Sequence, residues 1–180
     1  MKFSILNKIF KGKNRKVGVA LGGGAVRGLA HIGVLRVLEE NDIPIDCISG
    51  VSSGSIVGCI YASGRSACEL IEIMKESGWS DIGQVTVSKK GLFSSQKIED
   101  FIKKYSKTND FSKTKIPFAV SSVDLITGEE VIIKKGELSK AVRASVSFPG
   151  IYIPFEYNNK VLVDGSIENI LPKSFIRNGS

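Results

Sequence analysis

A short apolar run leads directly into a glycine-rich turn and then into a segment of helical periodicity, and this unit constrains the fold most. Val17 to Leu21 has the composition of a short buried strand. Gly22 to Gly28 supplies the turn, and Leu29 to Glu40 repeats apolar residues at helical spacing until Asn41 to Pro44 stops the helix. A buried strand followed at once by a helix is the repeating unit of α/β folds, so we expect a sheet covered by helices.

The rest of the chain continues this alternation. Further strands are predicted at 45–48, 116–124, 130–134 and 161–163, and further helices at 55–63, 66–76, 95–105 and 138–145. Residues 106–115, rich in Lys, Ser and Thr, are expected to form a surface loop. We therefore predict an α/β fold in three layers, with a mostly parallel central sheet flanked by helices on both faces.

The positive charge is concentrated at the start of the chain. Of the net charge of +7, six charges lie in residues 1–16, so the body is nearly neutral and a nucleic-acid-binding face is not expected. We divide the chain into a basic tail, 1–16, and one domain, 17–180. Apolar residues of the tail fall at spacings of three and four, at Phe3, Leu6, Ile9 and Phe10. The tail is either a helix lying on an anionic membrane surface or a disordered, solubilising segment.

The cysteine and histidine counts bound the compartment and the metal chemistry. Cys47, Cys59 and Cys68 are odd in number and form no CxxC pair, which favours free thiols in a reducing compartment. With a single histidine, a Cys/His zinc site is not expected, and we predict neither a metal nor a cofactor. No apolar run approaches the roughly 20 residues that span a bilayer. We expect a cytoplasmic protein, with the basic tail as the element that would bring it to the inner membrane surface.

The glycine-rich turn does not fit either common nucleotide-binding motif. In Gly22-Gly23-Gly24-Ala25-Val26-Arg27-Gly28, no frame matches GxGxxG, and no GK[ST] follows the turn. What remains is either a tight packing turn or a nest of backbone N–H groups near a helix N-terminus. Such a nest stabilises an anion, including the oxyanion of acyl transfer, and Arg27 would add positive charge.

A second glycine-containing turn places a serine where a catalytic nucleophile would lie. Gly50-Val51-Ser52-Ser53-Gly54 is the only GxSxG in the chain, with a predicted strand before it and a predicted helix after it. This is the setting of a nucleophile elbow, in which Gly50 and Gly54 allow close packing around a strained central serine. We assign Ser52 as the candidate nucleophile and read the neighbouring serines as capping or local hydrogen-bonding groups.

A nucleophilic serine needs a base, and no histidine follows Ser52. A Ser–Asp–His triad in that order is therefore excluded. The single histidine, His31, lies on the apolar side of its predicted helix, which indicates a structural role. The base is then a carboxylate at a strand end, where functional groups of α/β sheets gather. Asp164, after the strand 161–163, is the first candidate, and Asp124 is the second.

Together these stretches resemble the patatin-like phospholipase family over residues 16–172. The glycine-rich turn is similar to the family's GGGxRG motif, Gly50 to Gly54 to its GxSxG elbow, and Asp164-Gly165-Ser166 to its DG[GA] motif, with Ser in place of Gly or Ala. The segment Ala141 to Pro149 also looks like a family block. The resemblance implies a Ser–Asp dyad of Ser52 and Asp164, with an oxyanion hole formed by Gly22, Gly23, Gly24, Ala25, Arg27 and Gly28.

The resemblance implies a metal-independent serine hydrolase that cleaves fatty acyl esters, with a phospholipid or a simpler lipid ester as substrate. The alternative is a non-catalytic lipid- or membrane-binding module that keeps the fold. Family members normally continue after the equivalent of Leu171-Pro172 with a helix and a further strand, so we expect either a fragment or a trimmed domain, with a sheet edge exposed.

Overall fold

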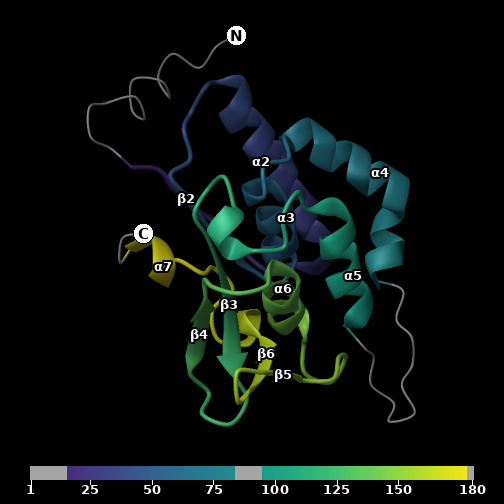
Figure 1. The fold of residues 1–180 in the computed structure, drawn as a ribbon, viewed down its shortest axis with the longest axis vertical. Helices are drawn as coiled ribbons and strands as arrows, with labels where there is room; N and C mark the ends of the chain where they lie inside the picture. Colours follow the sequence, from purple (N-terminus) through teal and green to yellow (C-terminus); the bar gives the residue numbers. More distant parts are fainter. Residues whose placement is uncertain (1–15, 84–94, 178–180) are drawn as a thin grey trace.

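The computed structural model describes residues 16–83 and 95–177 (Figure 1). The basic tail falls almost wholly outside these residues, so its membrane contact stays a prediction. Every predicted strand and helix is present, with ends that shift by a few residues. The strands are β1 Gly18–Leu21, β2 Cys47–Val51, β3 Phe118–Asp124, β4 Glu130–Ile133, β5 Phe155–Tyr157 and β6 Lys160–Asp164. The helices are α2 Leu29–Glu40, α3 Ser53–Ala62, α4 Ala67–Gly83, α5 Gln96–Tyr105, α6 Leu138–Val146 and α7 Ser174–Arg177.

Four segments differ from the prediction. Helix α4 extends to Gly83, past the predicted end at residue 76, and β5 and α7 were not predicted. The hairpin between β5 and β6 turns at Asn158-Asn159, both with positive φ (49° and 61°), as a two-residue hairpin turn requires. Residues 106–115 do not form a simple surface loop, because a 3-10 turn at Phe111–Lys113 buries the Phe111 side chain.

The six strands form one mixed sheet, which corrects the expectation of mostly parallel pairing. Strands β1, β2 and β3 pair in parallel, but β4, β5 and β6 all join by antiparallel pairs. The cause lies in the connections. Strands β3 and β4, and strands β5 and β6, are joined by short turns that return the chain antiparallel, whereas the parallel strands are joined through helices.

Strand β3 pairs with strands from both halves of the chain. Strand β4 pairs with residues 120–123 along one edge of β3, so β2 and β6 must share the other edge. Strand β2 runs parallel to β3 and its last pair is Val51 with Ser121. Strand β6 runs antiparallel and its last pair is Asp164 with Ser122. The carboxyl ends of β2 and β6 therefore face each other across a single step of β3.

Helices cover the sheet on both faces, which gives the predicted three-layer arrangement. Helices α3 and α6 pack on one face, with α5 against both of them, and α7 lies against β1 and β2 on the other face (Figure 1). Helix α3 is buried at every residue. The largest core side chains come from helices α2 to α6 and from the sheet, including Leu35, Ile48, Ile60, Leu70, Ile102, Leu138 and Leu162. Within residues 16–83 and 95–177, every helix falls short of the length and apolarity that a bilayer span requires.

Candidate active site

Ser52 occupies a sharp turn between β2 and α3. Its φ of 52° and ψ of −127° are rare for a residue with a side chain, and such conformations cost roughly 1–3 kcal/mol. The flanking glycines allow this turn. A Cβ at Gly54 would lie 2.1 Å from the Leu21 carbonyl oxygen, and one at Gly50 would lie 2.6 Å from the Ser55 Cα. Both sites therefore exclude any side chain, and the strand and helix pack close around a half-buried Ser52.

Hydrogen bonds hold the backbone of Ser52 from both sides. Its N–H donates to the Ser145 hydroxyl of α6 over 2.9 Å. Its carbonyl accepts from the Ser55 N–H over 2.9 Å and from the Ser55 hydroxyl over 2.6 Å. Since a strained conformation persists only where its surroundings determine it, these bonds explain how the turn is maintained.

Asp164 faces Ser52 from the end of β6. It is 2% exposed, and its carboxyl group interacts with the Ser52 side chain, which favours the charged form. Ser166 donates to this carboxyl group, from its N–H over 2.9 Å and from its hydroxyl. Burial raises the pKa of Asp164 above its ordinary value, and the interactions with Ser52 and Ser166 offset part of that rise. A carboxylate with a raised pKa is a stronger base, which suits proton abstraction from a serine.

The other two titratable candidates lie in different settings. Asp124 pairs with Lys160 (3.0 Å) and accepts from the Ile126 N–H, and these bonds lower its pKa. A carboxylate stabilised in this way is a weak base. His31 donates from Nε2 to the Gly22 carbonyl over 2.9 Å, which ties α2 to the glycine-rich turn. His31 thus has a structural partner, as its position on the helix indicated.

The glycine-rich turn lies against the elbow. A Cβ built at Gly23 would lie 3.3 Å from the Ser52 Cβ, and one at Gly28 would lie 2.7 Å from the Ser53 Cβ. The Gly23 N–H donates to the Ile170 carbonyl over 3.0 Å, so it is not free to bind an anion. The N–H groups of Gly24 and Ala25 donate no hydrogen bond within the described part of the chain.

The remaining residues of the predicted oxyanion turn help to maintain the conformation of the turn. Gly22 supplies the carbonyl that His31 binds, and Arg27 is exposed, with its N–H donating to the Gly24 carbonyl. Ala25 has a φ of 49°, so the turn kinks at the point where its free N–H groups lie. The donors available to an anion within the described residues therefore include those of Gly24 and Ala25.

The described residues contain no group of three His, Cys, Asp or Glu side chains that could hold a metal ion. The three cysteines are free thiols in the structure, with Cys47 and Cys59 buried and Cys68 exposed.

A comparison with family models decides the relationship that the site suggests. The model of the patatin-like phospholipases matches residues 19–173, nearly all of the domain described above. The chain belongs to the patatin-like phospholipase family. Within this patatin-like domain, the three glycine-containing stretches of the sequence converge on Ser52 and Asp164.

Curated relatives of this patatin-like chain are longer proteins. An NTE family protein of Mycobacterium tuberculosis is 34% identical over 160 residues, which cover 88% of this chain and 27% of that protein. A second NTE family protein of the same species is 32% identical and covered to 44%. The lysophospholipase NTE1 of Cryptococcus neoformans is 32% identical over 164 residues, 10% of its length. The chain thus spans less than half of each of these relatives.

Solved structures support the patatin fold at low identity. VipD of Legionella pneumophila superposes with a TM-score of 0.58 at 13% identity, over 84% of this chain and 46% of that one. ExoU of Pseudomonas aeruginosa, solved in complex with SpcU, superposes with a TM-score of 0.57 at 18% identity, over 79% and 41%. At these identities the likeness concerns the fold alone.

Sequence reasoning missed several polar residues that surround the pair. Ser145 and Ser166 hydrogen-bond to Ser52 and Asp164, but nothing in their sequence context distinguishes them from other serines. Ser55, read from the sequence as a local hydrogen-bonding group, donates to the Ser52 carbonyl. The one available signal was the segment Ala141 to Pro149, which resembled a family block without a chemical role. The structure supplies that role, because this segment contacts the backbone of both Ser52 and Asp164.

Proposed function

We propose that this domain is a serine hydrolase that cleaves fatty acyl esters through a dyad of Ser52 and Asp164. The observation that carries the proposal is the geometry: a strained Ser52 follows β2 and lies across one step of β3 from the buried carboxyl group of Asp164. A strained serine at a strand–helix turn and a base within hydrogen-bond reach are the two parts that nucleophilic catalysis needs. The mechanism requires no metal ion.

In the proposed reaction, the Ser52 Oγ attacks the ester carbonyl carbon while Asp164 takes the hydroxyl proton. The N–H groups of Gly24 and Ala25 stabilise the oxyanion of the tetrahedral intermediate. This intermediate collapses to an acyl ester of Ser52, and the proton on Asp164 passes to the alkoxide that leaves. Water then attacks the acyl group, again with Asp164 as the proton acceptor. The second tetrahedral intermediate collapses, the proton on Asp164 passes to the leaving Ser52 Oγ, and the carboxylic acid is released.

A lipid ester is supported as the substrate by apolar side chains beside this pair. Two segments that flank the dyad expose large hydrophobic residues. The segment after α6 exposes Phe148, Ile151 and Ile153. The segment after Asp164 exposes Ile167, Ile170 and Leu171. The second segment lies against the glycine-rich turn, since the Gly23 N–H binds the Ile170 carbonyl. Exposed apolar surface next to a reactive serine suits an acyl chain. The family and the lysophospholipase among the relatives agree with this class.

The test is hydrolysis of p-nitrophenyl esters of short and long acyl chains by the full chain, followed by hydrolysis of a lysophospholipid. We expect Ser52→Ala and Asp164→Asn each to lower kcat by about 10³-fold or more, as loss of a nucleophile or its base does in other serine hydrolases. Ser53→Ala, the neighbouring serine, is the matched control and should remain active. An active Ser52→Ala protein would overturn the assignment.

A fluorophosphonate probe separates this function from a non-catalytic lipid-binding domain. The proposal predicts a covalent adduct on Ser52 in the folded protein and none in Ser52→Ala. A folded protein that binds lipid vesicles but forms no adduct would instead favour the binding module.

A further inference from the structure

The last turn of α6 contacts the backbone of both residues of the dyad. The Ser145 hydroxyl accepts a hydrogen bond from the Ser52 N–H (2.9 Å). Two residues later, the Ser147 carbonyl accepts from the Asp164 N–H (3.1 Å). One helical turn therefore spans the two strand ends that carry the nucleophile and the base.

The direction of the Ser145 hydrogen bonds is fixed. Its hydroxyl donates to the Ser121 carbonyl over 2.6 Å, so the oxygen is left to accept from Ser52. Ser121 is the β3 residue that pairs with Val51, the last residue of β2. The hydroxyl thus bridges the two main chains at the point where β2 leaves the sheet and turns into the strained Ser52. Ser145 is fully buried, so water does not compete for either bond.

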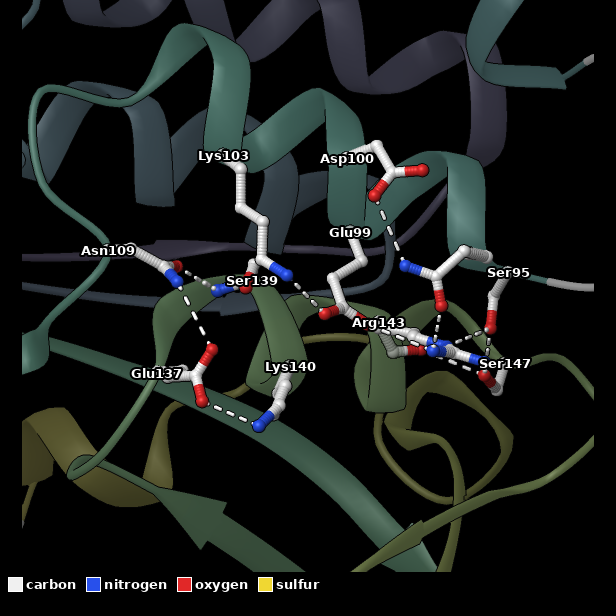
Figure 2. Close-up of polar contacts among 11 residues, drawn as sticks. Ser95, Glu99, Asp100, Lys103, Asn109, Glu137, Ser139, Lys140, Arg143 and Ser147 are labelled. Atoms are coloured by element: carbon white, nitrogen blue, oxygen red, sulfur yellow. Dashed lines mark hydrogen bonds and ion pairs between the residues drawn. The ribbon is translucent and has the colours of Figure 1, made fainter.

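A network between α5 and α6 holds this turn in place (Figure 2). Arg143 reaches across to α5, where it binds the Glu99 carboxylate (2.9 Å) and the Ser95 hydroxyl (3.2 Å). Lys103 binds the other oxygen of Glu99 over 2.7 Å. The Ser147 hydroxyl donates to the Arg143 carbonyl within the turn. The end of α6 is thereby fixed to α5 on one side and to the dyad on the other.

We infer that Ser145 is a positioning residue, which holds the Ser52 backbone in the conformation that directs its Oγ toward Asp164. This inference rests on the proposed function. Ser145 touches neither the substrate nor the reacting atoms, and it acts only through the Ser52 amide. Removal of its hydroxyl takes away the acceptor of the Ser52 N–H and the link from Ser52 to the Ser121 carbonyl, so the elbow can relax and the nucleophile moves away from the base. A displacement of about 1 Å in such a site can cost about 100-fold in rate.

The experiment compares Ser145→Ala with Ser139→Ala in the full chain. Ser139 lies on the same helix, is equally buried, and its hydroxyl has no hydrogen-bond partner among the residues that the structure describes. With p-nitrophenyl butyrate as substrate, we expect Ser145→Ala to lower kcat by at least about 10-fold, with KM within about twofold of wild type. The rate of fluorophosphonate labelling should fall in parallel. Ser139→Ala should keep the wild-type kcat.

Two results would overturn the inference. The first is a Ser145→Ala protein with a kcat within about twofold of wild type, and the second is an equal loss in Ser139→Ala, which would indicate a general effect on helix α6. Ser145→Thr keeps the hydroxyl, so its kcat should exceed that of Ser145→Ala. Equal kcat values for these two variants would also contradict the inference. The Ser52→Ala protein separates the two hypotheses. If it stays active, the proposed function fails; if it is inactive while Ser145→Ala is unimpaired, only the positioning role fails.

Discussion

Ser52 directly follows β2 and Asp164 ends β6, and these two strands run toward each other along the same edge of β3. The parallel register of β2 stops at Ser121, and the antiparallel register of β6 stops at Ser122. A one-residue slip of β6 would turn its side chains to the opposite face of the sheet and remove Asp164 from Ser52. The pairing of one short strand therefore decides whether the dyad exists.

The first prediction concerns the pH dependence of hydrolysis. Asp164 must be deprotonated to accept a proton, so kcat/KM should fall as the pH drops through its pKa. Because burial raises that pKa, the midpoint should lie above the ordinary value of 3.8. Ser166→Ala removes a hydrogen bond that favours the charged form, so its midpoint should lie higher still. The check is kcat/KM in a pH-stat, with circular dichroism to confirm folding, and an unshifted midpoint in Ser166→Ala would contradict this role.

The second prediction is that Asp164→Asn stabilises the fold while it abolishes hydrolysis. A raised pKa in the folded state means that folding favours the neutral carboxyl group. The stabilising effect of that neutral form is present below the unfolded pKa and is lost as the pH rises through the folded value. At neutral pH the buried charge thus costs stability, and Asn does not carry it. Thermal unfolding at neutral pH should show a higher Tm for Asp164→Asn, and the difference should shrink at acidic pH.

The third prediction tests the close packing of the elbow. Gly54→Ala would bring a methyl group against the Leu21 carbonyl oxygen, so we expect a loss of about 1–3 kcal/mol in the free energy of unfolding. Gly33→Ala in α2 is the control, since a Cβ there meets no atom within 4 Å. That change should stabilise the protein by about 0.5–1 kcal/mol. Urea denaturation measures both, and equal effects of the two changes would refute the packing argument.

The fourth prediction separates a structural histidine from a catalytic one. His31→Phe removes the donor to the Gly22 carbonyl, and the glycine-rich turn that carries the free N–H groups loses a support. We expect kcat to fall several-fold, without a change in the pH at which the acidic limb of kcat/KM lies. If His31 were the general base, its removal would abolish or shift the acidic limb of kcat/KM. A shifted limb in His31→Phe would therefore contradict the Ser–Asp dyad.

The fifth prediction concerns the ion pairs that join α5 to α6. Burial raises the pKa of Glu99, but the bonds from Lys103 and Arg143 outweigh it and the net pKa is lowered. Such a carboxylate stabilises the fold above its unfolded pKa, and the effect is lost as the pH falls through the lowered value. Arg143→Gln leaves a buried carboxylate with one cation fewer, so it should cost about 1–3 kcal/mol at neutral pH.

The same variant should show a weaker loss of stability on acidification than wild type, because less of its stability depends on ionised Glu99. Lys75→Gln is the control, since Lys75 and Glu72 form an exposed pair (66% and 64% exposed) that contributes well under about 1 kcal/mol. Denaturation of the three proteins at neutral and acidic pH gives both comparisons. A cost for Arg143→Gln no larger than that of Lys75→Gln would show that the cluster does not hold the helices together.

The local elements and the candidate dyad could be predicted from the sequence because each depends on residues close together in the chain. Helix α2 begins and ends at the predicted residues, since its apolar spacing and its stop at Asn41 are local signals. The strand before Ser52 and the helix after it follow in the same way. The pairing of strands is not local, and the mixed sheet was missed because nothing in β6 itself records that it runs antiparallel to β3.

The polar residues that support the dyad were beyond prediction for a related reason. Ser145 is 93 residues from Ser52, and only the packing of α6 on the sheet brings them together. Among the predicted oxyanion residues, Gly23 donates its N–H to the Ile170 carbonyl and cannot offer it to an anion. That contact likewise depends on a distant segment. Composition and spacing indicate which residues can react, but the tertiary fold decides which hydrogen bonds remain free.

The meeting of β2 and β6 on β3 also bears on the order of events during folding. The strand–turn–helix unit around Ser52 is built from neighbours in the chain, whereas Asp164 arrives only when a segment from the other end of the domain closes a long loop. Helical structure should therefore appear early in refolding and reactivity toward a serine-directed probe late. The reactivity of Ser52 toward such a probe therefore reports when the last long-range contact of the fold forms.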